Sequence, residues 1–129
     1  LTVPTVLAIP RRVVKGLDYN KVLLLLAVAR KHLHLSLEKF DLYVNVVGGV
    51  NIKSTTADLG FIASLISSIK NQPPPKESLF IGEVGLLGEI RKTYFQEKIE
   101  QEGKRLGFSS IYSSINLKNI TEIKSIFKF

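Results

Sequence analysis

The sequence predicts a single α/β domain of the α+β type, residues 1–129, in which helices pack on a mixed sheet. Segments with alternating apolar residues, typical of strands, alternate with segments whose apolar residues recur every three or four positions, typical of helices. The length of 129 residues suits one domain with a real core, and 45% of the residues are hydrophobic. The charged fraction of 22% is ordinary for a globular protein.

The first predicted elements are a strand and a long helix. Residues 12–15 are expected to form a short strand. Asp18 is a suitable N-cap for a helix from Tyr19 to about Leu33, because its carboxylate can accept a hydrogen bond from the first turn. The apolar run over 22–28 gives this helix a broad face to bury.

A second strand and a second helix follow. Residues 41–47 alternate in the manner of a strand, Gly48-Gly49 permits a turn, and residues 51–53 are expected to continue as strand. Thr55 or Thr56 is the expected cap of the next helix. Its apolar residues follow the helical period and are Leu59, Ile62, Ala63, Ile66 and Ile69. The proline-rich segment 71–75 ends it.

The last third predicts a hairpin, a helix, a strand and a final helix. The expected ranges are strands over 79–84 and 86–90 around Gly85, a helix over 95–106 before Gly107, a strand over 110–113, and a helix ending near Phe127. Asn119 and Glu122 have the spacing of a capping box, in which each side chain binds the other residue's backbone N–H.

Several kinds of site are not expected. The chain has no cysteine, which excludes disulfides, thiol nucleophiles and Cys-ligated metals. His32 and His34 are two residues apart, so they lie on different sides of a helix and are expected at its surface end rather than on a metal. No phosphate-binding loop motif is present, and the apolar run at 23–29 is too short to span a membrane. We therefore expect neither a metal nor a cofactor in this domain, and no membrane partner.

The net charge of +7 permits contact with a polyanion. Lys21 is the most informative basic residue, because it falls in the first turn of its helix. A cation there opposes the helix dipole and costs a few tenths of a kcal/mol up to about 1 kcal/mol. A bound anion would explain the residue, and a solvated surface lysine is the alternative.

Five segments, taken in order and spacing, resemble one family. They are Pro10–Val13, Gly16–Lys21 (GLDYNK), Val44–Val50 (VNVVGGV), Thr56–Leu59 (TADL) and Gly82–Arg91 (GEVGLLGEIR). Together they cover roughly residues 10–108 and are similar to the Lon-protease-like domain that closes the RadA/Sms family of bacterial DNA-recombination ATPases. The resemblance implies the Lon-type domain fold for this chain.

The resemblance also implies which domains accompany this one in the full-length protein. In such proteins a zinc finger and a RecA-like motor domain precede this domain, and the motor binds ATP and Mg²⁺. The parent protein is then a DNA-dependent ATPase or helicase that forms a hexameric ring on DNA. This chain would be a domain excised from it, acting in a bacterial cytoplasm or an organelle of bacterial descent.

Lon-type peptidases use a serine nucleophile and a lysine that takes its proton. The position that matches the serine is Thr56. The position that matches the lysine is Glu97 when counted without gaps, and a shift of one residue gives Gln96 or Lys98. A carboxylate at Glu97 cannot replace a neutral amine as the base, so the resemblance implies a degenerate dyad. An active Ser/Thr-Lys peptidase remains the alternative, with Thr56 and Lys98 as its pair.

The resemblance finally implies a tier of the ring that follows the phosphate backbone without reading bases. Lys21, Arg91 and Lys53 are the expected contacts, with Arg11 and Arg12 behind them. The partners would be duplex and single-stranded DNA and further copies of the chain. A pure oligomerisation module that never touches DNA is the third hypothesis.

Overall fold

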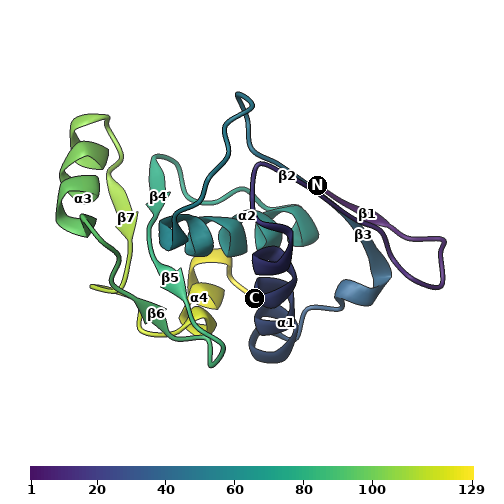
Figure 1. Ribbon diagram of the computed structural model, residues 1–129. Helices are drawn as coiled ribbons and strands as arrows, with labels where there is room; N and C mark the ends of the chain where they lie inside the picture. The colour runs from purple at the N-terminus through teal and green to yellow at the C-terminus, as the bar shows by residue number, and fades with distance from the viewer.

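The computed structural model describes residues 1–129 and contains four α-helices and seven short strands (Figure 1). The helices are α1 (Tyr19–Leu33), α2 (Asp58–Lys70), α3 (Gln96–Arg105) and α4 (Ile123–Phe127). The strands are β1 (Thr2–Pro4), β2 (Arg12–Lys15), β3 (Phe40–Asn45), β4 (Ser78–Phe80), β5 (Glu83–Val84), β6 (Ile90–Arg91) and β7 (Ser110–Tyr112). Single 3₁₀ turns are η1 (Leu37–Lys39), η2 (Thr55–Ala57) and η3 (Ile120–Glu122).

The α+β class is confirmed, with one mixed sheet and two further strand pairs. The strands form a three-stranded sheet in the order β1-β3-β2 and two separate pairs, β4-β7 and β5-β6. In the larger sheet β3 runs antiparallel to β1 and parallel to β2. Figure 1 shows that sheet at one end of the molecule and α3 with β7 at the other, with α1 and α2 between them. None of the helices is both long and apolar enough to cross a membrane.

The core lies between α1, α2 and the segment around α4. Twenty buried apolar residues form one continuous cluster. Val22 on α1, Ile62 and Ile66 on α2, and Phe127 on α4 are all 0% exposed. Burial of an aliphatic or aromatic side chain of this size contributes about 1.5–3 kcal/mol. The two long helices are therefore the rigid frame on which the short strands are held.

Two helix starts follow the sequence prediction. The α1 helix has the predicted bounds, and the Asp18 carboxylate accepts a hydrogen bond from the Lys21 backbone N–H at 2.8 Å. Asn119 and Glu122 form the predicted capping box at the start of η3. His34 is exposed and ends α1 in a left-handed conformation. The partly exposed His32 ring lies 3.1 Å from the Leu86 carbonyl, so both histidines are at the helix end as expected.

The segment before α2 differs from the prediction. Residues 51–53 are not a strand, and β3 ends at Asn45 instead of continuing to residue 47. The cap is Ser54, whose hydroxyl accepts the Thr56 backbone N–H at 3.1 Å. Neither Thr55 nor Thr56 caps the helix, because a 3₁₀ turn over these residues precedes α2 and moves the cap one residue upstream.

The hairpin and α3 also differ. Residues 79–84 divide into β4 and β5, and residues 86–88 form a turn, so the second hairpin strand is reduced to β6. The α3 helix begins at Gln96 instead of residue 95, because Phe95 adopts a left-handed conformation with φ 58°. Gly107, at φ 96°, follows the helix end as predicted. The β1 strand was not predicted; its sheet contact comes from pairing with the distant β3.

Candidate functional site

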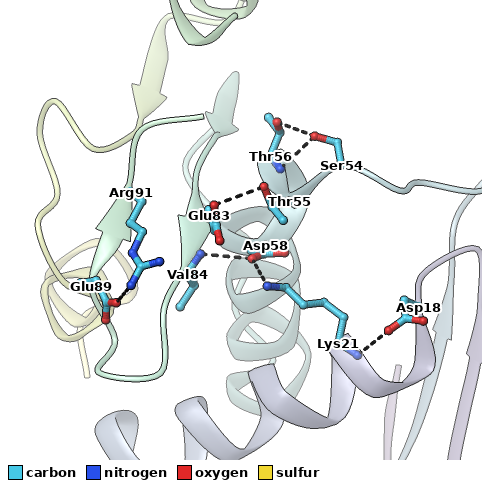
Figure 2. A network of polar contacts seen from close by, with 10 residues as sticks. All are labelled: Asp18, Lys21, Ser54, Thr55, Thr56, Asp58, Glu83, Val84, Glu89 and Arg91. Carbon is cyan, nitrogen blue, oxygen red and sulfur yellow. Dashed lines mark hydrogen bonds and ion pairs between the residues drawn. The ribbon is translucent and has the colours of Figure 1, made fainter. Parts of the chain in front are cut away.

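The start of α2 is joined to α1 and to β5 through the Asp58 carboxylate (Figure 2). The Lys21 ammonium lies 3.0 Å from Asp58 Oδ2, and the Val84 backbone N–H donates to the same oxygen at 3.1 Å. The Asp58 side chain is 5% exposed, whereas the Lys21 side chain is 32% exposed. An anion does explain the cation in the first turn of α1, but that anion belongs to the same chain.

Burial raises the pKa of the Asp58 carboxyl above its ordinary value, since the charged form loses its water. The Lys21 ammonium and the Val84 N–H act in the opposite direction, because they stabilise the carboxylate. Glu83 adds a further raising effect through like charge, and its carboxylate lies 3.5 Å from the Thr55 hydroxyl. The ion pair with Lys21 is thus what keeps a buried carboxylate compatible with the fold.

Two hollows meet at Lys21. One, of about 500 Å³, is lined by Lys21 and Lys53 together with polar residues of the 51–55 segment. The other, of about 390 Å³, is lined by Lys21 and Arg91 together with the β5-β6 hairpin. The structure therefore brings three of the five residues predicted to contact DNA around one region. Lys53 reaches it from an irregular segment, so the predicted strand over residues 51–53 is wrong.

Arg91 lies at the end of β6 and pairs with Glu89 at 2.6 Å (Figure 2). The Glu89 carboxylate folds over its own hairpin turn and accepts the Leu87 N–H at 3.0 Å. Hydrogen bonding to its own backbone N–H and then to Arg91 lowers the pKa of Glu89. A Cβ at Gly85 would lie 1.8 Å from Glu89 Oε1, so a larger residue there would displace the Glu89 carboxylate from its place over the turn.

Arg11 and Arg12 lie apart from this region, at the start of β2. The Arg12 guanidinium donates to the backbone carbonyls of Phe40 at 2.5 Å and Leu37 at 2.9 Å. The Arg11 backbone N–H donates to the Asp41 carboxylate at 2.7 Å, and this bond is the main cause of the lowered pKa of Asp41. Neither of the two hollows at Lys21 is lined by Arg11 or Arg12, and Arg12 lines a separate hollow. Arg11 and Arg12 therefore lie at a second location, apart from the other predicted DNA contacts. The Arg12 guanidinium is already occupied by hydrogen bonds within the chain.

The residues at the two peptidase positions do not form a dyad. The Thr56 hydroxyl lies 2.7 Å from the Ser54 hydroxyl and is hydrogen-bonded to no lysine. Glu97 is 76% exposed and pairs with Lys92 at 3.0 Å. Gln96 is 1% exposed, and Lys98 lies 5.6 Å from the centre of the Phe95 ring. No lysine at the matching positions is hydrogen-bonded to the Thr56 hydroxyl, whose partner is the Ser54 hydroxyl.

Asp58 and Glu83 are the residues of this region that sequence reasoning missed. A signal for Asp58 was present: it precedes Leu59 and stands one helical turn before Ile62, on the face that α2 buries. A carboxylate at the edge of such a face requires a partner. The sequence gives no spacing that identifies Lys21 as that partner, because the two come from different helices. No group of His, Cys, Asp or Glu side chains could hold a metal ion.

The chain was compared with known proteins. No protein-family model matches it. It is 48% identical over 101 residues to the DNA repair protein RadA of Haemophilus influenzae, which covers 78% of this chain and 22% of that protein. It is 40% identical over 124 residues to RadA of Bacillus subtilis, covering 95% of this chain and 27% of that protein. RadA of Rickettsia bellii is 40% identical over 114 residues, covering 88% and 25% respectively. The chain thus spans about a quarter of the length of these relatives, and it belongs to the RadA family.

Proposed function

We propose that this chain acts in DNA repair and recombination, as a non-catalytic Lon-like scaffold and non-specific DNA-binding tier of a RadA-type hexameric ATPase. The relatives that it matches carry the name DNA repair protein. The observation that carries the proposal is the gathering of Lys21, Lys53 and Arg91 around two adjoining hollows. Basic side chains from three separate parts of the chain can there follow a phosphate backbone without reading bases.

The three cations differ in how freely they can meet a phosphate. Lys53 is exposed and forms no ion pair. Arg91 is 59% exposed in its side chain, and its exposed pair with Glu89 is of the kind that contributes about 0–1 kcal/mol. Lys21 is held by the buried Asp58, so its charge is largely balanced. Within the proposal, Arg91 and Lys53 are therefore the main phosphate contacts. Lys21 has a structural role, because its ion pair with Asp58 holds together the elements that line both hollows.

In this proposal the domain itself catalyses no reaction, and ATP hydrolysis takes place in another domain of the full-length protein. The Thr56 hydroxyl faces Ser54, and the residues at the lysine position are an exposed, paired Glu97, a buried Gln96, and Lys98, whose ammonium lies over the Phe95 ring. This favours a non-enzymatic domain over the alternative of an active Lon-family peptidase. ATP and Mg²⁺ would be bound by a motor domain of the full-length protein, and its ring would form in the bacterial cytoplasm or an organelle of bacterial descent.

The scaffold part of the proposal is supported by exposed apolar side chains at loops and turns. They are Val6 and Ile9 before β2, Val47 and Val50 beside the Gly48-Gly49 turn, and Leu86 and Leu87 at the hairpin turn. Contiguous exposed apolar patches mark protein–protein interaction sites, and these three places are where the proposal expects contacts between copies of the chain. A pure oligomerisation module would have the same residues, so binding to DNA separates the two hypotheses.

The test is salt-dependent binding to duplex and single-stranded DNA, measured by fluorescence anisotropy. We expect little sequence preference and dissociation constants of roughly 10⁻⁴ to 10⁻⁶ M at physiological salt. Arg91→Ala and Lys53→Ala should each weaken binding equally for all sequences and lower the salt slope by up to about one unit. Lys76→Ala is the matched control, because Lys76 is equally exposed in the turn before β4 and lines neither hollow.

The outcomes are distinct. A double variant Arg91→Ala/Lys53→Ala that binds DNA as tightly as the original chain overturns the assignment of these contacts. A chain that binds no DNA at low salt, yet still self-associates in sedimentation experiments, supports the pure oligomerisation module instead.

A further inference from the structure

The connection between β6 and α3 exposes two adjacent aromatic rings. Tyr94 is 91% exposed and Phe95 is 72% exposed. Neither ring packs against another aromatic residue; the stacked rings of the protein are Phe80 with Tyr112 and Phe80 with Phe127. The connection lies at the α3 end of the molecule, away from the three-stranded sheet (Figure 1). The core therefore does not explain why these two positions are aromatic.

The backbone holds the two rings outward in a turn that is disfavoured for a bulky residue. Phe95 has φ 58° and ψ 22°, a left-handed conformation that glycine or asparagine adopts at lower cost. The turn is fixed by the buried Gln96, whose side-chain oxygen accepts the Thr93 N–H at 3.1 Å. The Gln96 backbone N–H in turn donates to the Thr93 carbonyl at 3.3 Å. The rings are thus presented by a locally anchored turn instead of by a loose loop.

Basic residues neighbour the two rings in the sequence, and the Lys98 ammonium lies over one of them. The Lys98 ammonium lies 5.6 Å from the centre of the Phe95 ring and forms no ion pair. Lys92 is 65% exposed and pairs with Glu97, while Arg91 is 59% exposed and pairs with Glu89. Exposed pairs of this kind contribute about 0–1 kcal/mol, so a phosphate can compete for either cation. Arg91, three residues before Tyr94, also lines the hollow that it shares with Lys21, so the proposed DNA contacts and the rings follow one another along the chain.

We propose that Tyr94 and Phe95 form a stacking site for the unpaired bases of single-stranded nucleic acid, with Arg91, Lys92 and Lys98 on the adjoining phosphates. Aromatic rings beside a basic track bind single strands because every base has a face on which a ring can stack. A duplex offers no such face along its length. The inference rests on the proposed function and deepens it, since it names the form of DNA that this end of the domain prefers.

The chemistry around the rings favours a nucleic acid over a protein partner. The centres of protein interfaces are poor in charged residues. Here the residues next to the rings in sequence and on the first turn of α3 include Lys92, Glu97 and Lys98, all exposed. An aromatic pair framed by charges fits a ligand that alternates flat bases with phosphates.

The experiment compares an oligothymidine strand with a duplex of mixed sequence, using the 129-residue chain. Tyr94→Ser and Phe95→Asn remove the rings, and asparagine suits the left-handed backbone, so the fold is retained. Each change should weaken single-strand binding roughly 5- to 100-fold, the range for loss of one stacked base. Duplex binding should change less than about twofold, because the phosphate contacts remain. Tyr94→Phe should bind the single strand as the original chain does.

Two controls make the result decisive. Leu106→Ser removes an apolar side chain that is 61% exposed after the other end of α3, and it should leave both affinities unchanged. The chain has no tryptophan, so tyrosine emission can be read directly; stacking on Tyr94 should quench part of it, and Tyr94→Ser should remove that quenching.

Equal single-strand affinity for the double variant Tyr94→Ser/Phe95→Asn and the original chain would overturn the stacking site while leaving the proposed function in place. A parallel loss of duplex and single-strand binding would also overturn it. A variant that keeps its DNA affinities but loses self-association would show that the rings belong to a contact between copies. An original chain that binds no DNA at all would overturn both proposals.

Discussion

The Lys21 ammonium on α1 and the Asp58 carboxylate on α2 form an ion pair of 3.0 Å that joins the first turns of the two longest helices. A cation in a first turn opposes the dipole of its own helix, whereas a carboxylate in a first turn is favoured by it. Asp58 therefore suits α2 and offsets the cost of Lys21 in α1. The pair also fixes the distance between α1 and the β5-β6 hairpin, because Asp58 accepts the Val84 N–H.

Lys21→Met keeps the length of the apolar stem and removes the charge, which leaves Asp58 buried without its ion-pair partner. We expect a loss of about 2 kcal/mol in the free energy of unfolding at neutral pH. Urea denaturation measures this loss. Lys53→Met is the control and should change stability by less than about 0.5 kcal/mol, because Lys53 is exposed and unpaired.

The same variant should depend on pH in a defined direction. The folded-state pKa of Asp58 is raised, and without Lys21 one of the influences that lower it is gone. A carboxyl with a raised folded pKa gives a stability advantage below its unfolded pKa of about 3.9, and that advantage disappears as the pH rises through the folded pKa. The loss caused by Lys21→Met should thus be larger at pH 7 than at pH 4. A loss that is equal at both pH values would contradict a buried, ionised Asp58.

Gly16→Ala and Gly48→Ala form a matched pair, since both glycines have positive φ angles of 93° and 86°. A Cβ at Gly16 would lie 2.6 Å from Val46 Cβ and 2.9 Å from the Val50 carbonyl oxygen, whereas a Cβ at Gly48 meets nothing within 4 Å. We expect about 1 kcal/mol for Gly48→Ala and about 3 kcal/mol or more for Gly16→Ala. Thermal unfolding measures both, and equal losses would mean that the close approach at Gly16 relaxes freely.

Ser54→Ala should cost about 1 kcal/mol through the lost cap, and Thr56→Ala less than half as much. The Ser54 hydroxyl accepts a backbone N–H, whereas the Thr56 hydroxyl contacts only that of Ser54. Neither change should affect peptide hydrolysis, because we expect none. Incubation with unfolded casein and fluorogenic peptides tests this. Turnover that disappears in Thr56→Ala or in Lys98→Ala would revive the peptidase hypothesis.

Arg12→Ala should destabilise the chain by about 1.5–3 kcal/mol, because it leaves the Phe40 and Leu37 carbonyls without the guanidinium that binds them. Arg12→Lys should restore only part of the loss, since an ammonium does not reproduce the planar fork. Arg11→Ala is the control and should cost less than about 0.5 kcal/mol, because its bond to Asp41 uses the backbone N–H. Circular dichroism during urea unfolding compares the three variants.

Local signals were enough to predict some elements and not others. The bounds of α1 and the cap at Asp18 depend on residues next to one another, and these were predicted correctly. The β1 strand and the division of 79–84 into β4 and β5 depend on partners far along the chain. The backbone of Phe95 was also beyond local reasoning, because a bulky residue rarely adopts a left-handed conformation.

The candidate site shows the same division. The sequence identified Lys21, Lys53 and Arg91 as cations of interest, and the structure places them around two adjoining hollows. It could not predict that Lys21 pairs with Asp58, since the contact joins two helices, nor that Arg12 binds carbonyls of the segment before β3. Their roles on DNA stay predictions until binding is measured.

The sparse burial of α3 has a consequence for motion. This helix buries only Gln96 and Gly103, while α1 buries six residues. Segments with few buried apolar contacts open locally at a small free-energy cost, without unfolding of the whole domain. Amide hydrogens of α3 should therefore exchange with solvent far sooner than those of α1 and α2. The turn of Tyr94 and Phe95, anchored to α3 through Gln96, would then move together with α3 and adjust to an irregular strand, while α1 and α2 keep their packing.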